Sequence, residues 1–590
     1  MALAEGPLGL TVRVKLDVNV ENIPDSARKI QRWLKELPVV DLGESATLVF
    51  RLLYDLNQSP FTPRERLHLL EELNDISDQL ISSLSGTYIH SPLNHAPKLK
   101  SASDLVHALS TEQIFGYNAV IEDLVADPDR LAKQTKTVLV SACANALKCQ
   151  GLIQLQRYQL YKTVASKVWQ QQNIIYAKAV ELGVLDQKIK SESSDLQSIN
   201  HQFKRNITLS TCNPFQMKHG EVNECYQSLD LLSPLIEVTP KVNPLTLYAY
   251  STSLNIAPQP SDAIDSENDN WLGIDLNQAV DAVENNAIEN GQGFLGLFRK
   301  NTDLELTESL KIHLIEHWKT VKSRNFIRIN TDDATQAAIG MAASHHFLVE
   351  RLGEEVRERF FGKPKEKPMF ETSGLSIQVE EDDSQHSFVW NQENTFGNAS
   401  NTPRANDAFD SIYKPRDYEQ RREENQNKPF KELKTRNAYE WVHGLIKDVS
   451  PAGFCLAFEK SPSNNVESNE LVTVQNYKNG EIEYNLGLIR WNRWHNQDSF
   501  LIGVELISPQ ATPVRATLDW DYAKPAYHHN GLLLPEMPNV GVDNSIVLPP
   551  MGYRSGQTVA IMTPGQEYKI ELTKRILQTS NFIQFQYQPK

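Results

Sequence analysis

The feature that most constrains this fold is a change of hydrophobic periodicity along the chain. Between about residues 22 and 206, apolar residues recur at the spacing of one helix face, as in the segment from Leu67 to Ile81. Residues 437–590 instead contain short apolar runs separated by turn residues, a pattern typical of strands in small barrels. The two periods predict a multidomain α+β protein, with an N-terminal α-helical bundle or short solenoid followed by β domains.

The strongest local signal marks the start of one predicted helix. Thr62 is expected to be the N-cap, Pro63 the first helical residue and Glu65 the third. A hydroxyl and a carboxylate at this spacing each satisfy a backbone N–H that the end of a helix leaves free. We therefore expect a helix to begin at Pro63.

Changes in composition set the expected boundaries. Residues 8–20 alternate polar and apolar side chains, which predicts an opening strand. Residues 256–272 are acidic and rich in Pro and Ser, which favours a loop, and residues 353–436 are polar and poor in aliphatic side chains, which favours disorder. The expected parts are an N-terminal strand (1–21), an α-helical domain (22–245), an acidic linker (246–275), connecting helices (276–321) and a largely disordered tract (353–436).

The charge balance limits the classes of partner. The 590 residues include 59 Lys and Arg against 74 Asp and Glu, which gives a formal net charge of −15 at pH 7. A protein that coats nucleic acid needs a basic surface to displace counterions, so neither DNA nor RNA is expected as a partner. The sequence has no run of about 18 apolar residues and no secretory leader pattern. We expect no transmembrane segment and a cytoplasmic location.

Metal-site and catalytic motifs are scarce. Five cysteines with no CxxC string argue against a disulfide framework and a Cys-rich zinc site. The pairs His345-His346 and His528-His529 are adjacent in sequence, so their side chains point apart and are not expected to share a metal.

No enzymatic activity is expected either. The GxGxxG string at Gly291–Gly296 follows a helical pattern rather than a strand, which favours a turn over a dinucleotide site. Walker-type GxxxxGK[ST], HExxH and GxSxG strings do not occur in the sequence. A hydrolase or transferase with an unrecognised site is the least favoured class, and no catalytic residue is assigned.

The most informative string is D-x-S-x-x-G at Asp448–Gly453, which lies between two strand-like runs. On its own it predicts a hairpin turn, because Asp and Ser form local side-chain turns and Gly tolerates a positive φ. A G-hh-x-W strand at Gly487–Trp491 and an h-G-V-E-h strand at Ile502–Leu506 follow it. This layout resembles the PilZ domain, a small β-barrel family that binds the bacterial second messenger cyclic di-GMP.

PilZ domains carry a second signature, R-x-x-x-R, on the segment that leads into the barrel, and Arg324–Arg328 matches it. Here 119 residues separate Arg328 from Asp448. We interpret the tract at 353–436 as a long insertion, since loop-closure cost grows only logarithmically with length. The resemblance then implies a PilZ-like six-stranded β-barrel split between 322–352 and 437–520, and a small C-terminal β module at 521–590. In the alternative, the arginines come from 415–436, where no R-x-x-x-R string occurs; the candidates there are Arg416, Arg421, Arg422 and Arg436.

The resemblance also implies roles for five residues. Arg324 and Arg328 would wrap around cyclic di-GMP, because a guanidinium matches the O6/N7 edge of guanine and pairs with phosphate. Asp448 would accept from the N1/N2 edge of guanine, Ser450 would hydrogen-bond the ligand, and Gly453 would allow close approach of the backbone. Cyclic di-GMP is then a ligand, and no cofactor or metal is implied.

The resemblance extends to the helical half. The strings at Glu36–Val40, Ser59–Leu73 and Arg575–Tyr587 are similar to those of long proteobacterial PilZ-containing proteins. This implies a cyclic di-GMP receptor that transmits the second-messenger level to motility, type IV pili or biofilm by reorienting the helical half, which contacts a protein partner at the membrane or the cell pole. The alternative is a PilZ-like scaffold that binds no nucleotide and acts through protein–protein contacts of its helical half.

Overall fold

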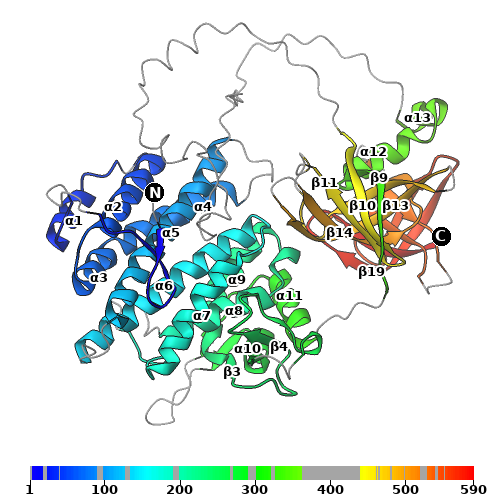
Figure 1. The fold of residues 1–590 in the computed structure, drawn as a ribbon. Coiled ribbons are helices and arrows are strands. Elements are labelled where there is room, and N and C mark those ends of the chain that lie inside the picture. Colours follow the sequence, from blue (N-terminus) through cyan, green and yellow to red (C-terminus); the bar gives the residue numbers. More distant parts are fainter. Residues whose placement is uncertain are drawn as a thin grey trace, which may run out of the picture. The chain divides into compact units, whose positions relative to one another are not determined.

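The computed structural model describes residues 3–16, 23–38, 40–89, 97–126, 133–189, 198–265, 270–289, 301–320, 326–361, 439–459, 462, 466–478, 481–496, 499–518, 528–537, 542–550 and 552–590. The described residues form two compact units, which we call the helical unit (3–320) and the barrel unit (326–590). Figure 1 shows the first in blue to green and the second mainly in yellow to red. The multidomain α+β class is confirmed.

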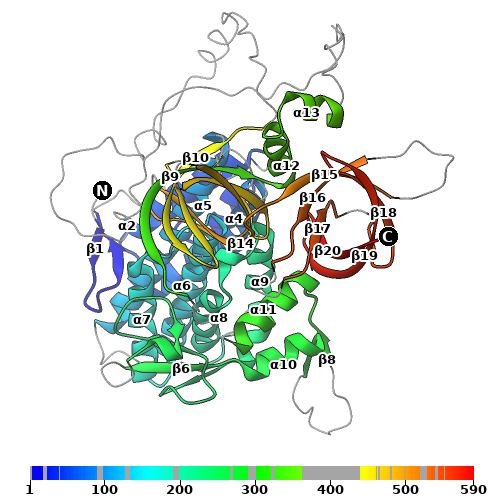
Figure 2. The ribbon, with the colours of Figure 1, turned by 90° about the vertical axis from the view of Figure 1, so that its right-hand side faces the viewer.

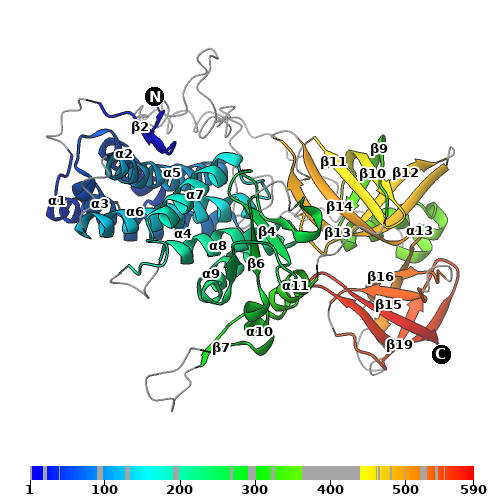
Figure 3. The same ribbon diagram turned by 60° about the horizontal axis from the view of Figure 1, so that its bottom comes forward.

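Two long helices, α5 and α6, pack along each other in the middle of the helical unit (Figures 1 and 3). Tyr117 of α5 and Leu147 of α6 are completely buried between their neighbours. The helices of this unit are α1 (Ala27–Leu34), α2 (Leu42–Gln58), α3 (Pro63–Glu72), α4 (Asn74–Tyr88), α5 (Pro97–Val125), α6 (Lys133–Gln159), α7 (Ser166–Glu181), α8 (Ile199–Thr211), α9 (His219–Leu232), α10 (Asn277–Asn285) and α11 (Glu308–Lys319).

Helix α3 begins where the sequence predicts. The Glu65 carboxylate accepts a hydrogen bond from the Thr62 backbone N–H at 3.0 Å, and Thr62 Oγ1 accepts one from the Glu65 N–H at 3.4 Å. Leu67 and Leu70, one turn apart, are buried against the core. The cap therefore fixes both the start of the helix and the face that it buries.

The prediction of an acidic linker at 246–275 is wrong. The segment supplies three strands of a four-stranded sheet in which Tyr250 and Ile274 are completely buried against the helices. The Pro- and Asp-rich stretches between these strands led to the loop prediction. The short apolar runs between them form the strands of the sheet. The strands are β3 (Glu237–Thr239), β4 (Tyr248–Ser251), β5 (Gln259–Pro260) and β6 (Trp271–Asp275), in the order β3-β6-β4-β5.

Two further predictions for the helical unit need adjustment. The opening strand at 8–20 is a hairpin of β1 (Leu3–Glu5) and β2 (Thr11–Arg13), because Gly9 turns the chain with a φ of +90°. The predicted connecting helices pack into the helical core through Leu310 and Leu314 of α11. A short ribbon of β7 (Ala287–Glu289) and β8 (Asn301–Asp303) lies between α10 and α11, and the GxGxxG string lies outside the described residues.

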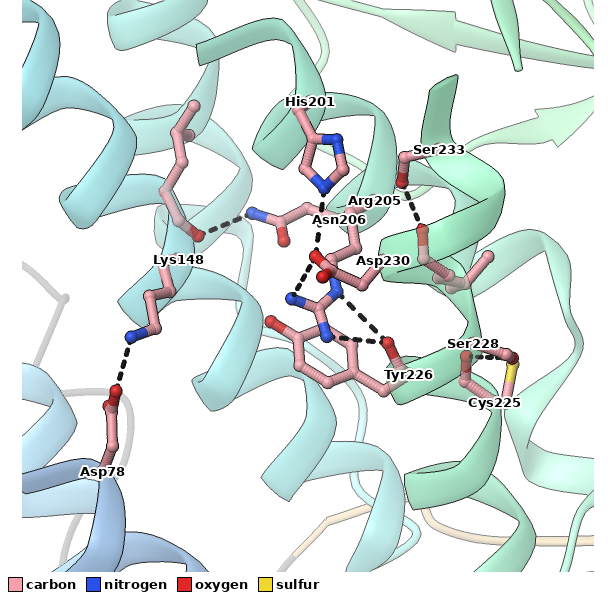
Figure 4. Close-up of polar contacts among 12 residues, drawn as sticks. Asp78, Lys148, His201, Arg205, Asn206, Cys225, Tyr226, Ser228, Asp230 and Ser233 are labelled. Atoms are coloured by element: carbon pink, nitrogen blue, oxygen red, sulfur yellow. Dashed lines mark hydrogen bonds and ion pairs between the residues drawn. The ribbon is translucent and has the colours of Figure 1, made fainter. Parts of the chain in front are cut away.

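Polar contacts fix the last helices of the unit to one another. His201 and Arg205 of α8 both reach Asp230 of α9, at 3.0 and 3.1 Å, and the Arg205 guanidinium lies 3.9 Å from the centre of the Tyr226 ring (Figure 4). Burial raises the pKa of the Asp230 carboxyl, but the hydrogen bond from His201 and the charge of Arg205 outweigh it, so that the pKa lies below its usual value.

Helix α11 is attached to α9 through its N-terminus. The Glu224 carboxylate accepts a hydrogen bond from the Thr307 backbone N–H at 2.6 Å, and Glu221 accepts one from the Ser309 hydroxyl at 2.8 Å. Carboxylates at a helix N-terminus also interact favourably with the helix dipole. The last element before the barrel unit is therefore fixed to α9.

Among the residues that the structure describes, one helix segment, Lys136–Gln159 of α6, is long and apolar enough to cross a membrane. However, 78% of its most apolar window is buried against the rest of the structure. This is the environment of a core helix, and its apolar surface is accounted for by packing.

The barrel unit contains two closed barrels, and the first has the six strands expected of a PilZ-like domain. Its first strand, β9, pairs antiparallel with β10 although more than a hundred residues separate them in sequence. The strands are β9 (Ile329–Ile339), β10 (Val442–Ser450), β11 (Gly453–Phe458), β12 (Leu471–Lys478), β13 (Glu481–Trp494) and β14 (Phe500–Ser508), closed in the order β10-β11-β14-β13-β12-β9.

Two helices follow β9 before the chain returns as β10. Helix α12 (Met341–Glu350) is followed by α13 (Glu354–Phe361), so the tract predicted to be disordered from residue 353 begins with a helix. Glu354 and Glu355 lie in the first turn of α13, where negative charge interacts favourably with the helix dipole. The remainder of the predicted insertion, from residue 362, lies outside the described residues.

The C-terminal β module is itself a closed six-stranded barrel (Figure 2, orange and red). The predicted boundary at 520 is misplaced, because β15 pairs with β16 and β18 of the second barrel. The strands are β15 (Thr512–Leu518), β16 (His528–Leu534), β17 (Ser545–Leu548), β18 (Thr558–Met562), β19 (Glu567–Gln578) and β20 (Ile583–Pro589).

Helix α12 packs against both barrels. Leu348 joins an apolar cluster that includes Leu486 of the first barrel and Leu532 of the second. His345 Nε2 lies 3.2 Å from the Val514 carbonyl oxygen, and burial lowers the pKa of this imidazole to about 4. His346 instead pairs with Glu350 at 3.2 Å, so the two adjacent histidines point to different partners.

Candidate ligand-binding site

The pairing of β9 with β10 brings together the two halves of the predicted motif. Asn330 pairs with Asp448 and Ile329 pairs with Val449, so Arg328 lies at the end of β10 that carries the D-x-S-x-x-G string. The Arg328 guanidinium donates through Nη1 to the Asp448 carboxylate, with the side chains 31% and 21% exposed. Register, rather than sequence proximity, therefore places this arginine in the site.

The D-x-S-x-x-G string forms a tight hairpin between β10 and β11. Asp448 and Ser450 are two residues apart on a strand, so their side chains lie on the same face. Ser450 Oγ donates to the Gly453 carbonyl oxygen at 3.4 Å. Gly453 has a φ of +153°, and a Cβ there would lie 1.9 Å from the Val504 carbonyl oxygen. Only glycine allows β14 to approach this closely.

An aromatic side chain lies on the outer face of the barrel, at the far end of a row of paired residues that begins at Asp448. Asp448 pairs with Cys455, Cys455 with Gly503, and Gly503 with Trp491, which forms one row across four strands. A Cβ on Gly503 would lie 2.0 Å from Trp491 Nε1, so the indole lies directly over this glycine. The ring therefore extends back from β13 toward the Asp448 side of the row.

Charged groups surround the Cys455 thiol, which is buried beneath this face. Burial, and to a smaller extent the charge of Asp448, raise the pKa of Cys455 to about 11. Arg328, Arg493 and Lys447 act in the opposite direction. Cys455 is thus a neutral thiol, and Asp448, Arg328, Arg493 and Lys447 lie close enough to affect its pKa.

The structure places the predicted residues as follows. Arg328, Asp448, Ser450 and Gly453 lie together at the paired ends of β9, β10 and β11. Arg324 lies outside the described residues, as do the alternative arginines, which are Arg416, Arg421, Arg422 and Arg436.

Sequence reasoning missed two neighbours of this group, Trp491 and Arg493. Both are on β13 with outward-facing register partners, Gly503 and Leu501. Trp491 belongs to the G-hh-x-W string, so the signal was present. Its place in the same row as Asp448 depends on a shift in the β13–β14 register between Ile489 and Trp491, which the sequence does not show.

The set of groups suits recognition of a purine nucleotide. A guanidinium can donate to the O6 and N7 acceptors of guanine, and a carboxylate can accept from its amino edge. An indole face supports base stacking. Among the described residues, no cluster of three or more His, Cys, Asp or Glu side chains has the geometry of a metal site.

Comparison with known families agrees with this geometry. Three consecutive family models match the chain: the N-terminal domain of the cyclic-di-GMP receptor FimW at residues 28–241, its middle PilZ domain at 247–513 and its C-terminal β-barrel domain at 523–589. The chain belongs to this family of PilZ-containing receptors, and the predicted PilZ resemblance is confirmed.

The chain is similar to the cyclic-di-GMP receptor FimW of Pseudomonas aeruginosa. This chain is 22% identical to it over 594 aligned residues, which cover 98% of this chain and 93% of the relative. No solved structure matches the chain. The similarity extends over the helical half as well as both barrels.

Proposed function

We propose that this protein is a non-enzymatic receptor for cyclic di-GMP, which binds on the outer face of the first barrel. The observation that carries the proposal is the contact of Arg328 with Asp448 across 119 intervening residues. The pairing of β9 with β10 brings both motif halves to one strand end. Family membership and the relative's description support the same ligand.

Each motif residue has a specific role in the proposed complex. Arg328 and Asp448 neutralise each other in the structure, and guanine offers complementary groups to both, an acceptor edge to the arginine and a donor edge to the carboxylate. Arg324 contributes the second guanidinium, Ser450 a hydroxyl, and Gly453 the close backbone approach. Trp491 supplies a ring face for stacking.

The proposed output passes through α11. This helix ends at Lys319, only nine positions before Arg328, and its N-terminus is fixed to α9 by Glu221 and Glu224. A nucleotide that holds Arg324 and Arg328 on the barrel restrains the connection to the helical unit. The reoriented helical unit then presents a different surface to a protein partner, in the cytoplasm or at the membrane or pole, in control of motility, type IV pili or biofilm.

Isothermal titration of the full-length protein tests this proposal. We expect saturable heat with cyclic di-GMP and none with GTP or cyclic di-AMP. Arg328→Ala should weaken binding about 5- to 150-fold, since one good arginine–guanine contact contributes about 1–3 kcal/mol. Absence of binding at about 100 μM ligand, for a folded protein, would favour the nucleotide-independent scaffold.

A further inference from the structure

A third arginine lies on the same outer face without a polar partner. Arg493 of β13 makes no hydrogen bond or ion pair with any other residue in the described part of the chain, and its Nε atom is buried. Its guanidinium carbon lies 5.4 Å from the centre of the Trp491 ring, a cation–π contact. A buried N–H without an acceptor is unfavourable, because the donor has lost its water and gained nothing in exchange.

Three other cations among the described residues of this barrel are paired with carboxylates. Arg328 pairs with Asp448, and Lys447 pairs with Asp332 at 2.6 Å. Arg490, three positions before Arg493, contacts Glu505 and also reaches Asn469 Oδ1 at 3.3 Å. Arg493 therefore carries positive charge that no described carboxylate balances.

The position of Arg493 links it to the predicted site. Arg493 pairs with Leu501, two residues along β13 from the Trp491–Gly503 pair of the row that leads to Asp448. Arg493 and Arg328 both act on the pKa of Cys455, which pairs directly with Asp448. Two guanidiniums thus lie near Cys455. That of Arg328 is paired with Asp448, whereas that of Arg493 has no carboxylate partner among the described residues.

We propose that Arg493 binds a phosphate of the nucleotide. Its guanidinium fork can donate from Nη1 and Nη2 to the oxygens of a phosphodiester, a charge-assisted contact for which arginine is well suited. The Trp491 ring holds the guanidinium in place, while Arg328 and Asp448 take the guanine. The assignment rests on the proposed nucleotide-receptor function and adds to it a phosphate subsite on β13, outside both sequence motifs.

Titration of full-length variants with cyclic di-GMP tests the assignment. Arg493→Ala should weaken binding about 10- to 150-fold, as expected for hydrogen bonds to a charged group. Arg493→Lys keeps the charge but loses the fork, so it should recover only part of this affinity. Arg490→Ala is the matched control on the same strand and should leave the dissociation constant unchanged within about twofold.

A second readout separates phosphate binding from a structural role. If Arg493 contacts phosphate, the affinity of Arg493→Ala should fall less between 50 and 300 mM salt than that of the parent protein, because one charge–charge contact is gone. Equal affinity and equal salt dependence in the variant would overturn the assignment while leaving the receptor function intact. A parent protein that binds no cyclic di-GMP would instead overturn the receptor function itself.

Discussion

The two barrels of this protein have the same strand order but present different chemistry. Each has six antiparallel strands, and if the strands of each are numbered from one to six in chain order, both close as 1-2-3-6-5-4. In the first barrel, an arginine precedes strand 1 and the turn from strand 2 to strand 3 carries Asp448, Ser450 and Gly453. In the second, Gln510 and Ala511 precede strand 1, and residues 535–544 join strands 2 and 3 without such a motif.

The difference shows that topology alone does not make a binding site. The described residues of the second barrel enclose an apolar core that includes Val514, Ile561 and Phe585. The first barrel combines a register shift in β10, a glycine at the hairpin and an indole lying over Gly503. We therefore expect nucleotide binding in the first barrel alone.

The largest expected effect is the loss of stability when the hairpin glycine of the first barrel is replaced, compared with a glycine of the second barrel. Gly453→Ala places a Cβ 1.9 Å from a backbone oxygen, so it should cost more than about 3 kcal/mol of stability and abolish cyclic di-GMP binding. Gly556→Ala has a φ of +86° but open space around it, and should cost only about 1–2 kcal/mol. Urea unfolding of both variants measures the difference; equal costs would refute the steric argument.

The second effect concerns the contact between the barrels and is a pH dependence. The folded pKa of His345 is about 4, below the unfolded value of about 6.5, so the unfolded state binds more protons in this window. Stability should fall as pH decreases from about 6.5 to 4, by up to about 1.4 kcal/mol per pH unit from this residue.

His345→Gln should reduce that slope, measured by urea unfolding at several pH values. His346→Gln is the control, because its imidazole is 42% exposed and pairs with Glu350 on the surface of α12. An unchanged slope in His345→Gln would show that burial of this imidazole between the barrels does not govern acid stability.

A third expected effect is the loss of cyclic di-GMP affinity when a carboxylate of the first barrel is removed, compared with one of the second barrel. Asp448→Ala should weaken cyclic di-GMP binding about 5- to 150-fold, since it removes the acceptor for the guanine amino edge. Asp543→Ala removes an exposed carboxylate of the second barrel that accepts from Gln586 at 2.8 Å, and it should leave affinity unchanged. Titration calorimetry of both variants gives the comparison, and equal losses would place the ligand elsewhere.

The smallest expected effect concerns aromatic rings. Trp491→Phe keeps an apolar ring over Gly503 but reduces the stacking surface, so affinity should fall about threefold. Tyr553→Phe in the second barrel removes only the hydroxyl 2.7 Å from His529 Nδ1 and should not alter affinity. Titration calorimetry with cyclic di-GMP measures both variants, and a larger loss of affinity in Tyr553→Phe would place the ligand on the second barrel.

Local patterns predicted most of the fold. The capping box at Thr62–Glu65 fixed the start of α3, and the period of two in 437–590 indicated strands of small barrels. The wrong predictions involve long-range contacts. Tyr250 and Ile274 lie in strands because the helical core covers them, and β15 belongs to the second barrel because it pairs with β16 and β18. Neither fact is visible in the local sequence.

The site divides in the same way. Asp448, Ser450 and Gly453 are recognisable because their spacing forms one hairpin, and Arg328 because it matches a known string. Trp491 and Arg493 reach the same face only through the pairing of four strands with register shifts in β10 and β13. A slip of one residue would turn both side chains to the other face, so their role depends on tertiary register.

Hydrogen–deuterium exchange of the full-length protein, with and without saturating cyclic di-GMP, tests the central claim most directly. The account predicts ligand-dependent protection in peptides covering residues 326–334 and 444–456, and unchanged exchange in the second-barrel strands at 528–534 and 583–589. Protection of the second barrel with none at Arg328 and Asp448 would contradict it.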